Sequence, residues 1–267
     1  MSVQESFVFG EGDKATLLLH GFLGSAKNLR SLARAWSNAD PGRRIYGVDL
    51  PGHGGGPALG ENPDLESLAT PLLPFCEQKG ISAVVGHSLG GRVALRMAGL
   101  RPSAFRDITL LDISPSPGLK QKSPVLAVLP ILLRAPDTSD SQQSMVDVLC
   151  ADGLGVAMAR WLVQSLVRNE DGGFWEWSID RKRLAQLHDR VTEESLWDVA
   201  EALGASLGCI RGGESSFVSD KTLDALAQFG AGVQSVEGAG HFLHIDKPKG
   251  LLEALLTLYP GEKDGNA

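Results

Sequence analysis

The chain has 267 residues, of which 43% are hydrophobic and 21% are charged, a composition typical of a globular protein with a sizeable core. Its formal net charge of -7 offers no basic face, so we expect neither a nucleic-acid partner nor a membrane partner. Three widely spaced cysteines favour neither a disulfide framework nor a zinc cluster, and the N-terminus does not resemble a signal peptide. We therefore expect a cytoplasmic protein.

Short apolar segments alternate with helix-like segments along the chain, which predicts an α/β fold with a mostly parallel central sheet flanked by helices. Each predicted strand is almost continuously apolar, as expected for strands that helices cover on both faces. In chain order, we expect strands at residues 15–20, 45–48, 82–86, 108–111, 206–211 and 233–236. We expect helices at residues 28–37, 65–78, 89–100, 220–228 and 249–258.

Residues 115–204 interrupt this alternation, because they contain no convincing strand and show helical spacing, for example at residues 156–167. We expect a helical cap here, inserted after the strand that ends near Leu111. The flanking residues, 1–114 and 205–267, then form a single α/β core.

The insertion also contains four of the five tryptophans of the chain. We expect Trp161, Trp175 and Trp177 to line a substrate pocket, because pockets for small molecules are rich in aromatic side chains. The alternative is that these large side chains only pack the insertion onto the sheet.

The sequence G-H-S-L-G at residues 86–90 lies between a predicted strand and a predicted helix. In this context a G-x-S-x-G motif forms a sharp turn that exposes a nucleophilic serine. Side chains at Gly86 and Gly90 would clash in such a turn, which explains why both are glycine. We therefore predict that Ser88 is a nucleophile, although an incidental serine in a glycine-rich turn is the alternative.

A serine nucleophile needs a histidine base, which a late loop can deliver. His241 follows a predicted strand and the small residues of G-A-G, so we prefer it to His244. The developing oxyanion needs two backbone N–H donors, one of them from the residue after the nucleophile. We predict the N–H groups of Leu89 and of Phe22, which lies in the loop after an early strand.

The chain resembles the α/β-hydrolase superfamily, in its capped serine esterase branch. The resemblance rests on four motifs in order along the chain, H-G-F-L-G-S at 20–25, D-L-P-G-H-G at 49–54, G-H-S-L-G-G at 86–91 and G-A-G-H-F-L-H at 238–244. Weaker matches at 111–115, 174–180 and 211–219 resemble bacterial esterases of the YbfF type, which hydrolyse short and medium acyl esters and thioesters.

The same resemblance bears on the acid of the catalytic triad. Most of the superfamily places an aspartate in the loop after the strand predicted at 206–211, but here that slot holds Ser215, beside Glu214. Some branches instead use the end of the preceding strand, where this chain has Asp112. We favour Asp112, because a strand end holds a side chain rigidly beside the active-site edge, and Glu214 is the alternative acid.

These features predict an enzyme, a carboxylic ester hydrolase that works through a Ser-His-acid triad and an acyl-enzyme intermediate. No metal or dinucleotide motif occurs, so we expect no metal and no cofactor, only an ester or thioester substrate and a monomer or homodimer. One alternative is a carbon–carbon lyase of the menaquinone-pathway type, which would bind an acidic substrate through Arg92, Arg160 and Arg168. The other is a non-catalytic ligand receptor on the same fold.

Overall fold

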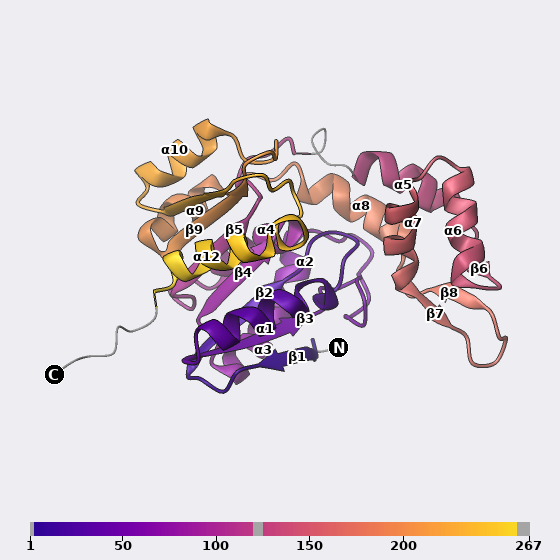
Figure 1. Ribbon diagram of the computed structural model, residues 1–267, viewed down its shortest axis with the longest axis horizontal. Helices are drawn as coiled ribbons and strands as arrows, with labels where there is room; N and C mark the ends of the chain where they lie inside the picture. Colours follow the sequence, from indigo (N-terminus) through magenta and orange to yellow (C-terminus); the bar gives the residue numbers. More distant parts are fainter. Residues whose placement is uncertain (1–2, 120–124, 261–267) are drawn as a thin grey trace.

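The central feature of the computed structural model, which describes residues 3–119 and 125–260, is a seven-stranded sheet (Figure 1). Its strands lie in the order β1-β3-β2-β4-β5-β9-β10. All six predicted strands are present, with ends within two residues of those expected: β2 (Lys14–Leu19), β3 (Arg43–Val48), β4 (Ala83–His87), β5 (Asp107–Leu111), β9 (Leu207–Gly212) and β10 (Gly232–Val236). These six are mutually parallel, which confirms the predicted fold class.

The seventh strand, β1 (Glu5–Phe9), was not expected from the sequence. It pairs antiparallel with β3 at the edge of the sheet. Of its five residues only Phe7 is buried, so the segment lacks the continuous apolar run that reveals the inner strands.

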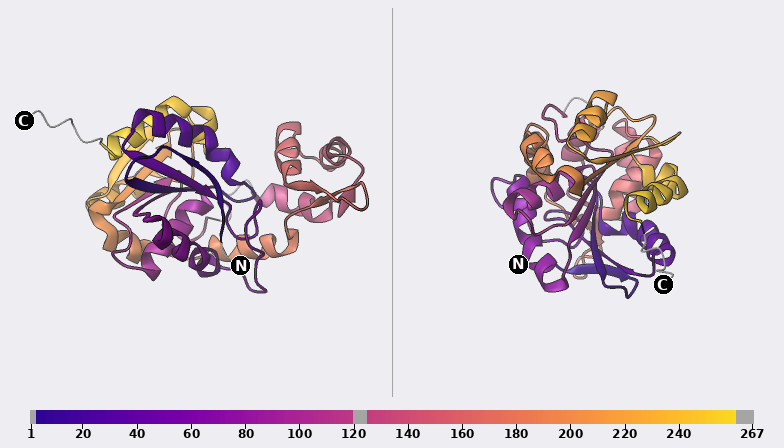
Figure 2. Two further views of the ribbon diagram at one scale, coloured as in Figure 1. Left: turned by 90° about the horizontal axis from the view of Figure 1, so that it is seen from below. Right: turned by 90° about the vertical axis from the view of Figure 1, so that its left-hand side faces the viewer.

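Helices cover both faces of the sheet (Figure 2, right). One face carries α1 (Arg30–Ala39) and α12 (Pro248–Leu258), which contact each other. The opposite face carries α2 (Leu65–Ala69), α3 (Leu73–Lys79), α4 (Leu89–Leu100) and α10 (Asp220–Gln228). The single helix expected at 65–78 is divided, because a 3₁₀ turn that contains Pro71 separates α2 from α3.

Residues 125–191, between β5 and β9, form a lobe to one side of the core (Figures 1 and 2, left). Its helices are α5 (Val125–Arg134), α6 (Gln142–Ala151), α7 (Val156–Leu162) and α8 (Arg181–Val191). The lobe also contains a small antiparallel sheet in the order β6 (Thr138–Ser139), β8 (Trp175–Trp177), β7 (Leu166–Arg168).

The expectation of an insertion without strands was therefore wrong. The helix expected at 156–167 ends at Leu162, and a 3₁₀ turn and β7 follow it. Strands of two or three residues are too short to show the alternating pattern by which a strand is recognised in a sequence.

The two ends of the insertion lie side by side. The N–H of Leu196 donates to the carbonyl of Pro115 at 2.9 Å, and the indole of Trp197 donates to the Ser116 hydroxyl at 3.1 Å. Helix α9 (Trp197–Leu203), within the predicted cap, packs against the core helix α4. The division into a core and a cap at residues 115 and 204 stays a prediction.

Candidate active site

Ser88 stands in the tight turn between β4 and α4. Its backbone has φ 53° and ψ -117°, a strained conformation for a residue other than glycine. A Cβ atom at Gly86 would lie 2.2 Å from the carbonyl of Gly90, and one at Gly90 would lie 2.4 Å from the carbonyl oxygen of Leu19. The two glycines of the motif therefore let the helix start directly against the sheet, with Ser88 at the turn.

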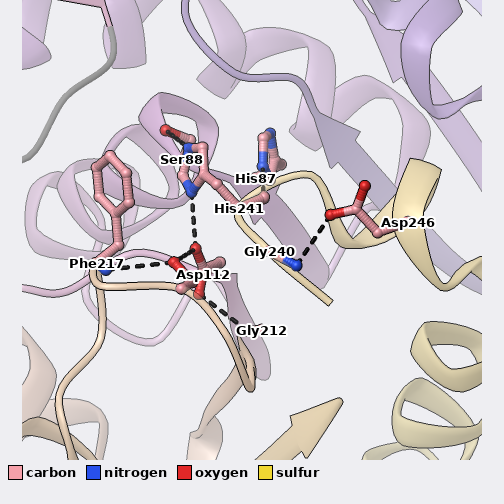
Figure 3. A network of polar contacts seen from close by, with 9 residues as sticks. His87, Ser88, Asp112, Gly212, Phe217, Gly240, His241 and Asp246 are labelled. Atoms are coloured by element: carbon pink, nitrogen blue, oxygen red, sulfur yellow. Dashed lines mark hydrogen bonds and ion pairs between the residues drawn. The ribbon is translucent and has the colours of Figure 1, made fainter. Parts of the chain in front are cut away.

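Ser88 belongs to a continuous chain of hydrogen bonds that joins three separate strand ends (Figure 3). Its hydroxyl lies 3.0 Å from Nε2 of His241, in the loop after β10. Nδ1 of His241 lies 2.7 Å from Oδ2 of Asp112, directly after β5. With Nδ1 protonated, Nε2 is free to accept the Ser88 proton. The structure thus brings together the residues chosen from the sequence as nucleophile, base and favoured acid.

The loop that carries His241 is fixed on both sides. The N–H of Gly240 donates to Oδ2 of Asp246 at 2.9 Å (Figure 3), and Nε2 of His87 donates to the His241 carbonyl at 2.8 Å. The ring of Phe217 stacks on the His241 imidazole with centroids 4.0 Å apart and planes inclined by 19°. Phe217 was not expected at the site, because nothing in the sequence places a late-loop phenylalanine against a distant histidine.

The two candidate acids differ in position. Asp112 is completely buried, and its Oδ1 accepts the N–H of Gly212 at 3.0 Å. Its φ of 51° lies in the left-handed region, which aspartate tolerates better than most residues. Glu214 is exposed, and within the described residues its side chain has no hydrogen bond or ion pair. The structure therefore joins Asp112, and not Glu214, to His241.

The two predicted oxyanion donors, the N–H groups of Phe22 and Leu89, both border the pocket that contains Ser88. Among the backbone hydrogen bonds of the described residues, neither N–H has a carbonyl acceptor. His20 braces the loop before Phe22, because its Nε2 accepts the Leu50 N–H at 3.0 Å and its Nδ1 donates to the Gly21 carbonyl at 2.8 Å.

Four further histidines surround this machinery in uncharged form. Burial lowers the pKa of His20, lowers that of His87 well below its ordinary value, and lowers that of His244 to about 4. Burial also lowers the pKa of His53 to about 3. These rings therefore add no positive charge beside His241 at neutral pH.

A cavity of about 80 Å³ opens at Ser88, and both the core and the insertion line it. The core wall includes His20, Phe22, Leu29, Ile113, Phe217, Phe242 and Ile245. The insertion supplies Leu119, Val125, Val128, Met158, Trp161, His188 and Val191. Because most of these groups are apolar, the pocket suits an uncharged, apolar ligand.

Of the three tryptophans predicted to line the pocket, only Trp161 does so. The prediction was wrong for Trp175 and Trp177, which lie on β8 in the small sheet of the insertion. The indole of Trp177 donates to the Pro136 carbonyl at 2.9 Å, and the Arg181 guanidinium lies 5.4 Å from its ring. These contacts stabilise the insertion itself, because β8 pairs with strands on both sides.

The arginines considered for an acidic substrate are not placed for it. Arg92 borders the pocket, but its guanidinium donates to the carbonyls of Ser114, Ser116, Val191 and Glu194. Arg160 and Arg168 do not line the pocket. Arg92 is therefore the one arginine or lysine among the described lining residues, and main-chain groups already engage it.

Two further features are absent from the described residues. Within residues 3–119 and 125–260, no three histidine, cysteine or acidic side chains are grouped so as to hold a metal ion. Over the same part of the chain, no helix combines the length and the apolar character needed to cross a membrane.

Comparison with known proteins agrees with the fold. A model of the alpha/beta hydrolase family matches residues 16–254. The sn-1-specific diacylglycerol lipase ABHD11 of Mus musculus is 29% identical over 253 residues, which is 91% of this chain and 80% of that protein.

Two bacterial esterases are also similar. Esterase YbfF of Escherichia coli is 26% identical over 246 residues, 90% of each chain, which confirms the resemblance inferred from the motifs. Esterase Rv0045c of Mycobacterium tuberculosis is 33% identical over 225 residues, 79% of this chain and 73% of that protein. Its solved structure superimposes with a TM-score of 0.71 over 97% of this chain and 91% of that one. The chain belongs to the alpha/beta hydrolase family.

Proposed function

We propose that the protein is a serine carboxylic ester hydrolase with Ser88, His241 and Asp112 as its catalytic triad. The observation that carries the proposal is the unbroken hydrogen-bond chain from the Ser88 hydroxyl through the imidazole to the buried carboxylate. An oriented imidazole bonded to a hydroxyl is the arrangement that activates serine for attack on a carbonyl. The esterase names of the two bacterial relatives support the same chemistry.

The reaction follows from the positions of these groups. Nε2 of His241 takes the Ser88 proton as Oγ attacks the acyl carbonyl, and Asp112 stabilises the resulting imidazolium. The N–H groups of Phe22 and Leu89 donate hydrogen bonds to the developing oxyanion. His241 then protonates the leaving alcohol or thiol. A water molecule that His241 deprotonates attacks the acyl-enzyme, the bond between the acyl carbon and Oγ breaks, and His241 returns the proton to Ser88 as the carboxylic acid is released.

The substrate that suits this pocket is a short to medium acyl ester or thioester. The walls are largely apolar, and the cavity of about 80 Å³ has little room for a long chain. Arg92 already donates to main-chain carbonyls, so a carboxylate on the acyl chain would meet no free cation among the described lining residues. We therefore propose an uncharged acyl group.

The same placement of the arginines gives no support to the carbon–carbon lyase alternative, which needs a cationic pocket. The receptor alternative predicts binding without turnover, whereas a serine bonded to an oriented histidine predicts turnover.

A cytoplasmic location and a monomer or homodimer stay predictions. The three free cysteines, Cys76, Cys150 and Cys209, are consistent with a reducing compartment.

The test is hydrolysis of p-nitrophenyl acetate, butyrate and octanoate and of a butyryl thioester. We expect turnover by the wild type and a loss of roughly 10⁴-fold or more in kcat/KM for Ser88→Ala. Ser216→Ala is the matched control, because Ser216 is exposed and its side chain has no hydrogen bond within the described residues. A wild type that binds these esters but completes at most one turnover would overturn the proposal in favour of a receptor.

A further inference from the structure

His244 is a pocket residue that the proposed reaction does not use. It lies in the short helix α11 (Leu243–Asp246), just after His241, and it borders the cavity at Ser88. The centroid of its ring lies 4.9 Å from that of His87, and the centroid of the His241 ring lies 4.8 Å from the same ring. One short turn therefore brings a second histidine to the pocket beside the proposed base.

The backbone of this turn is fixed by hydrogen bonds of Asp246. Its N–H donates to the Phe242 carbonyl at 2.9 Å, and its carboxylate accepts the N–H of Gly240 at 2.9 Å. Both partners flank His241 in the sequence. The turn therefore holds His241 and His244 at a constant spacing, so a ligand beside one ring lies near the other.

The two ring nitrogens of His244 have different surroundings. Nδ1 is buried from solvent, and within the described residues it has no hydrogen-bond partner. Burial, with a smaller effect of the neighbouring His241, lowers the pKa of His244 to about 4, so the ring is neutral at pH 7 and carries one proton. Because a buried N–H without an acceptor is disfavoured, we place this proton on Nε2. The partly exposed ring thus offers an Nε2–H donor on its open side.

A donor beside His241 lies on the leaving-group side of a bound ester. Nε2 of His241 must reach the leaving oxygen to protonate it, so the leaving group contacts the side chains around that ring. Two of these neighbours that border the pocket, Phe217 and Phe242, are apolar. A third, His87, already donates to the His241 carbonyl. Among these described neighbours, His244 is the one with a hydrogen bond to give to a leaving group.

We propose that His244 is a specificity-determining residue, whose Nε2–H donates to an uncharged oxygen of the leaving group. The preferred substrate is then an ester of an alcohol that carries an ether or hydroxyl oxygen close to the ester bond. A simple alkyl chain at this place would displace water from Nε2 and give no hydrogen bond in exchange. The inference rests on the triad proposed above, because it needs a leaving group beside His241.

The first experiment compares 2-methoxyethyl butyrate with butyl butyrate, two esters that differ by an oxygen in place of one CH₂ group. We expect His244→Phe to lower the ratio of their kcat/KM values by about 10-fold relative to wild type, because one hydrogen bond is lost. His244→Gln keeps an N–H group near the position of Nε2 and retains most of the ratio. The intrinsic difference in reactivity between the esters is common to all the proteins and cancels.

Ile245→Ala is the matched control, because Ile245 borders the same pocket and has an apolar side chain. It should change the rates of both esters by the same factor. A merely structural role of His244, acting through the rings of His87 and His241, would likewise slow both esters alike. An unchanged ratio in His244→Phe therefore overturns the proposal. A thermal melt shows whether this variant is folded, and His244→Leu is the second apolar replacement.

The second experiment tests on which side of the ester bond the oxygen binds. An alcohol that attacks the butyryl-enzyme occupies the place of the leaving group. His241 takes its proton, its oxygen bonds to the acyl carbon, the bond from that carbon to Oγ breaks, and Ser88 regains a proton. With p-nitrophenyl butyrate as acyl donor, we expect wild type to form more ester from 2-methoxyethanol than from 1-butanol. His244→Phe should lose about 10-fold of this preference.

The opposite placement has its own pair of substrates, p-nitrophenyl 3-methoxypropanoate and p-nitrophenyl pentanoate, which carry the exchanged group on the acyl side. We expect His244→Phe to leave the ratio for this pair within about two-fold of wild type. A loss confined to the acyl-side pair overturns the assignment to the leaving group.

Failure of this inference and failure of the triad give different results. A wild type that hydrolyses both butyrate esters with a ratio that His244→Phe does not change contradicts only the role of His244. A wild type that is inert on both of them and on p-nitrophenyl butyrate contradicts the triad and, with it, the role of His244.

Discussion

The core and the insertion both border the pocket, but they supply different chemistry. The core provides the three residues of the proposed triad and places each of them beyond the end of a parallel strand: Ser88 after β4, Asp112 after β5 and His241 in the loop after β10. The insertion provides a wall that is largely apolar, with Val125, Val128 and Met158 among its residues. In the proposed reaction, the sheet therefore positions the catalytic groups and the lobe beside it selects the acyl group.

Arg92 connects the core to both ends of the insertion through hydrogen bonds. From the core helix α4, its guanidinium donates to the carbonyls of Ser114 and Ser116 where the insertion begins. It also donates to those of Val191 and Glu194 near its end. Burial lowers the pKa of Arg92 to about 10, so the side chain is still charged at pH 7.

The largest change in stability is expected when Arg92 is replaced. Arg92→Met leaves several buried carbonyls without a donor, so we expect the free energy of unfolding to fall by roughly 3 kcal/mol or more. Urea unfolding measures the change. Arg134→Met is the control, because the pair between Arg134 and Asp152 is exposed and contributes at most about 1 kcal/mol. Equal losses for the two variants would mean that Arg92 does not join the regions.

The next largest effect is a loss of stability at low pH, and it comes from a buried histidine of the core. Burial lowers the pKa of His53 to about 3, while in the unfolded chain it is near 6.5. The unfolded state therefore takes up the proton first, and the stability contributed by neutral His53 is present above pH 6.5 and lost as the pH falls. Between pH 7 and pH 5 this single ring accounts for about 2 kcal/mol.

His53→Gln removes that dependence. The difference in unfolding free energy between wild type and variant should be constant above pH 7 and should shift by about 2 kcal/mol in favour of the variant by pH 5. Urea titrations at each pH measure it. A difference that stays the same from pH 7 to pH 5 would show that His53 titrates alike in the folded and unfolded chains.

The same division explains how much could be predicted from the sequence. Inner strands of the core are buried on both faces, so β4 and β5 are visible as apolar runs, and the residues that follow them could be assigned to the active-site edge. The insertion offered no such signal. Its strands have two or three residues, and the positions of Trp175 and Trp177 depend on pairing with β6 and β7, which no local pattern encodes.

Within the site, contacts between distant loops could not be predicted from the sequence. Asp112 was favoured over Glu214 because it ends a strand, and that argument needs only the order of elements. The stacking of Phe217 on His241 and the bond from Ser215 to Asp112 join segments more than twenty and one hundred residues apart. Such contacts follow from the packing of the β9 loop against its neighbours, so residue type and spacing could not reveal them.

The smallest effect separates the two roles of tryptophan in the insertion. Trp161 borders the pocket, so Trp161→Ala should lengthen it and raise the ratio of kcat/KM for octanoate over acetate by about 10-fold. Trp177 lies outside it, and Trp177→Ala should lower stability while leaving that ratio within about two-fold. Both ratios are measured with p-nitrophenyl esters. If the two variants shift the ratio alike, the insertion controls acyl selection through its overall stability, whereas a shift for Trp161 alone assigns selection to its wall of the pocket.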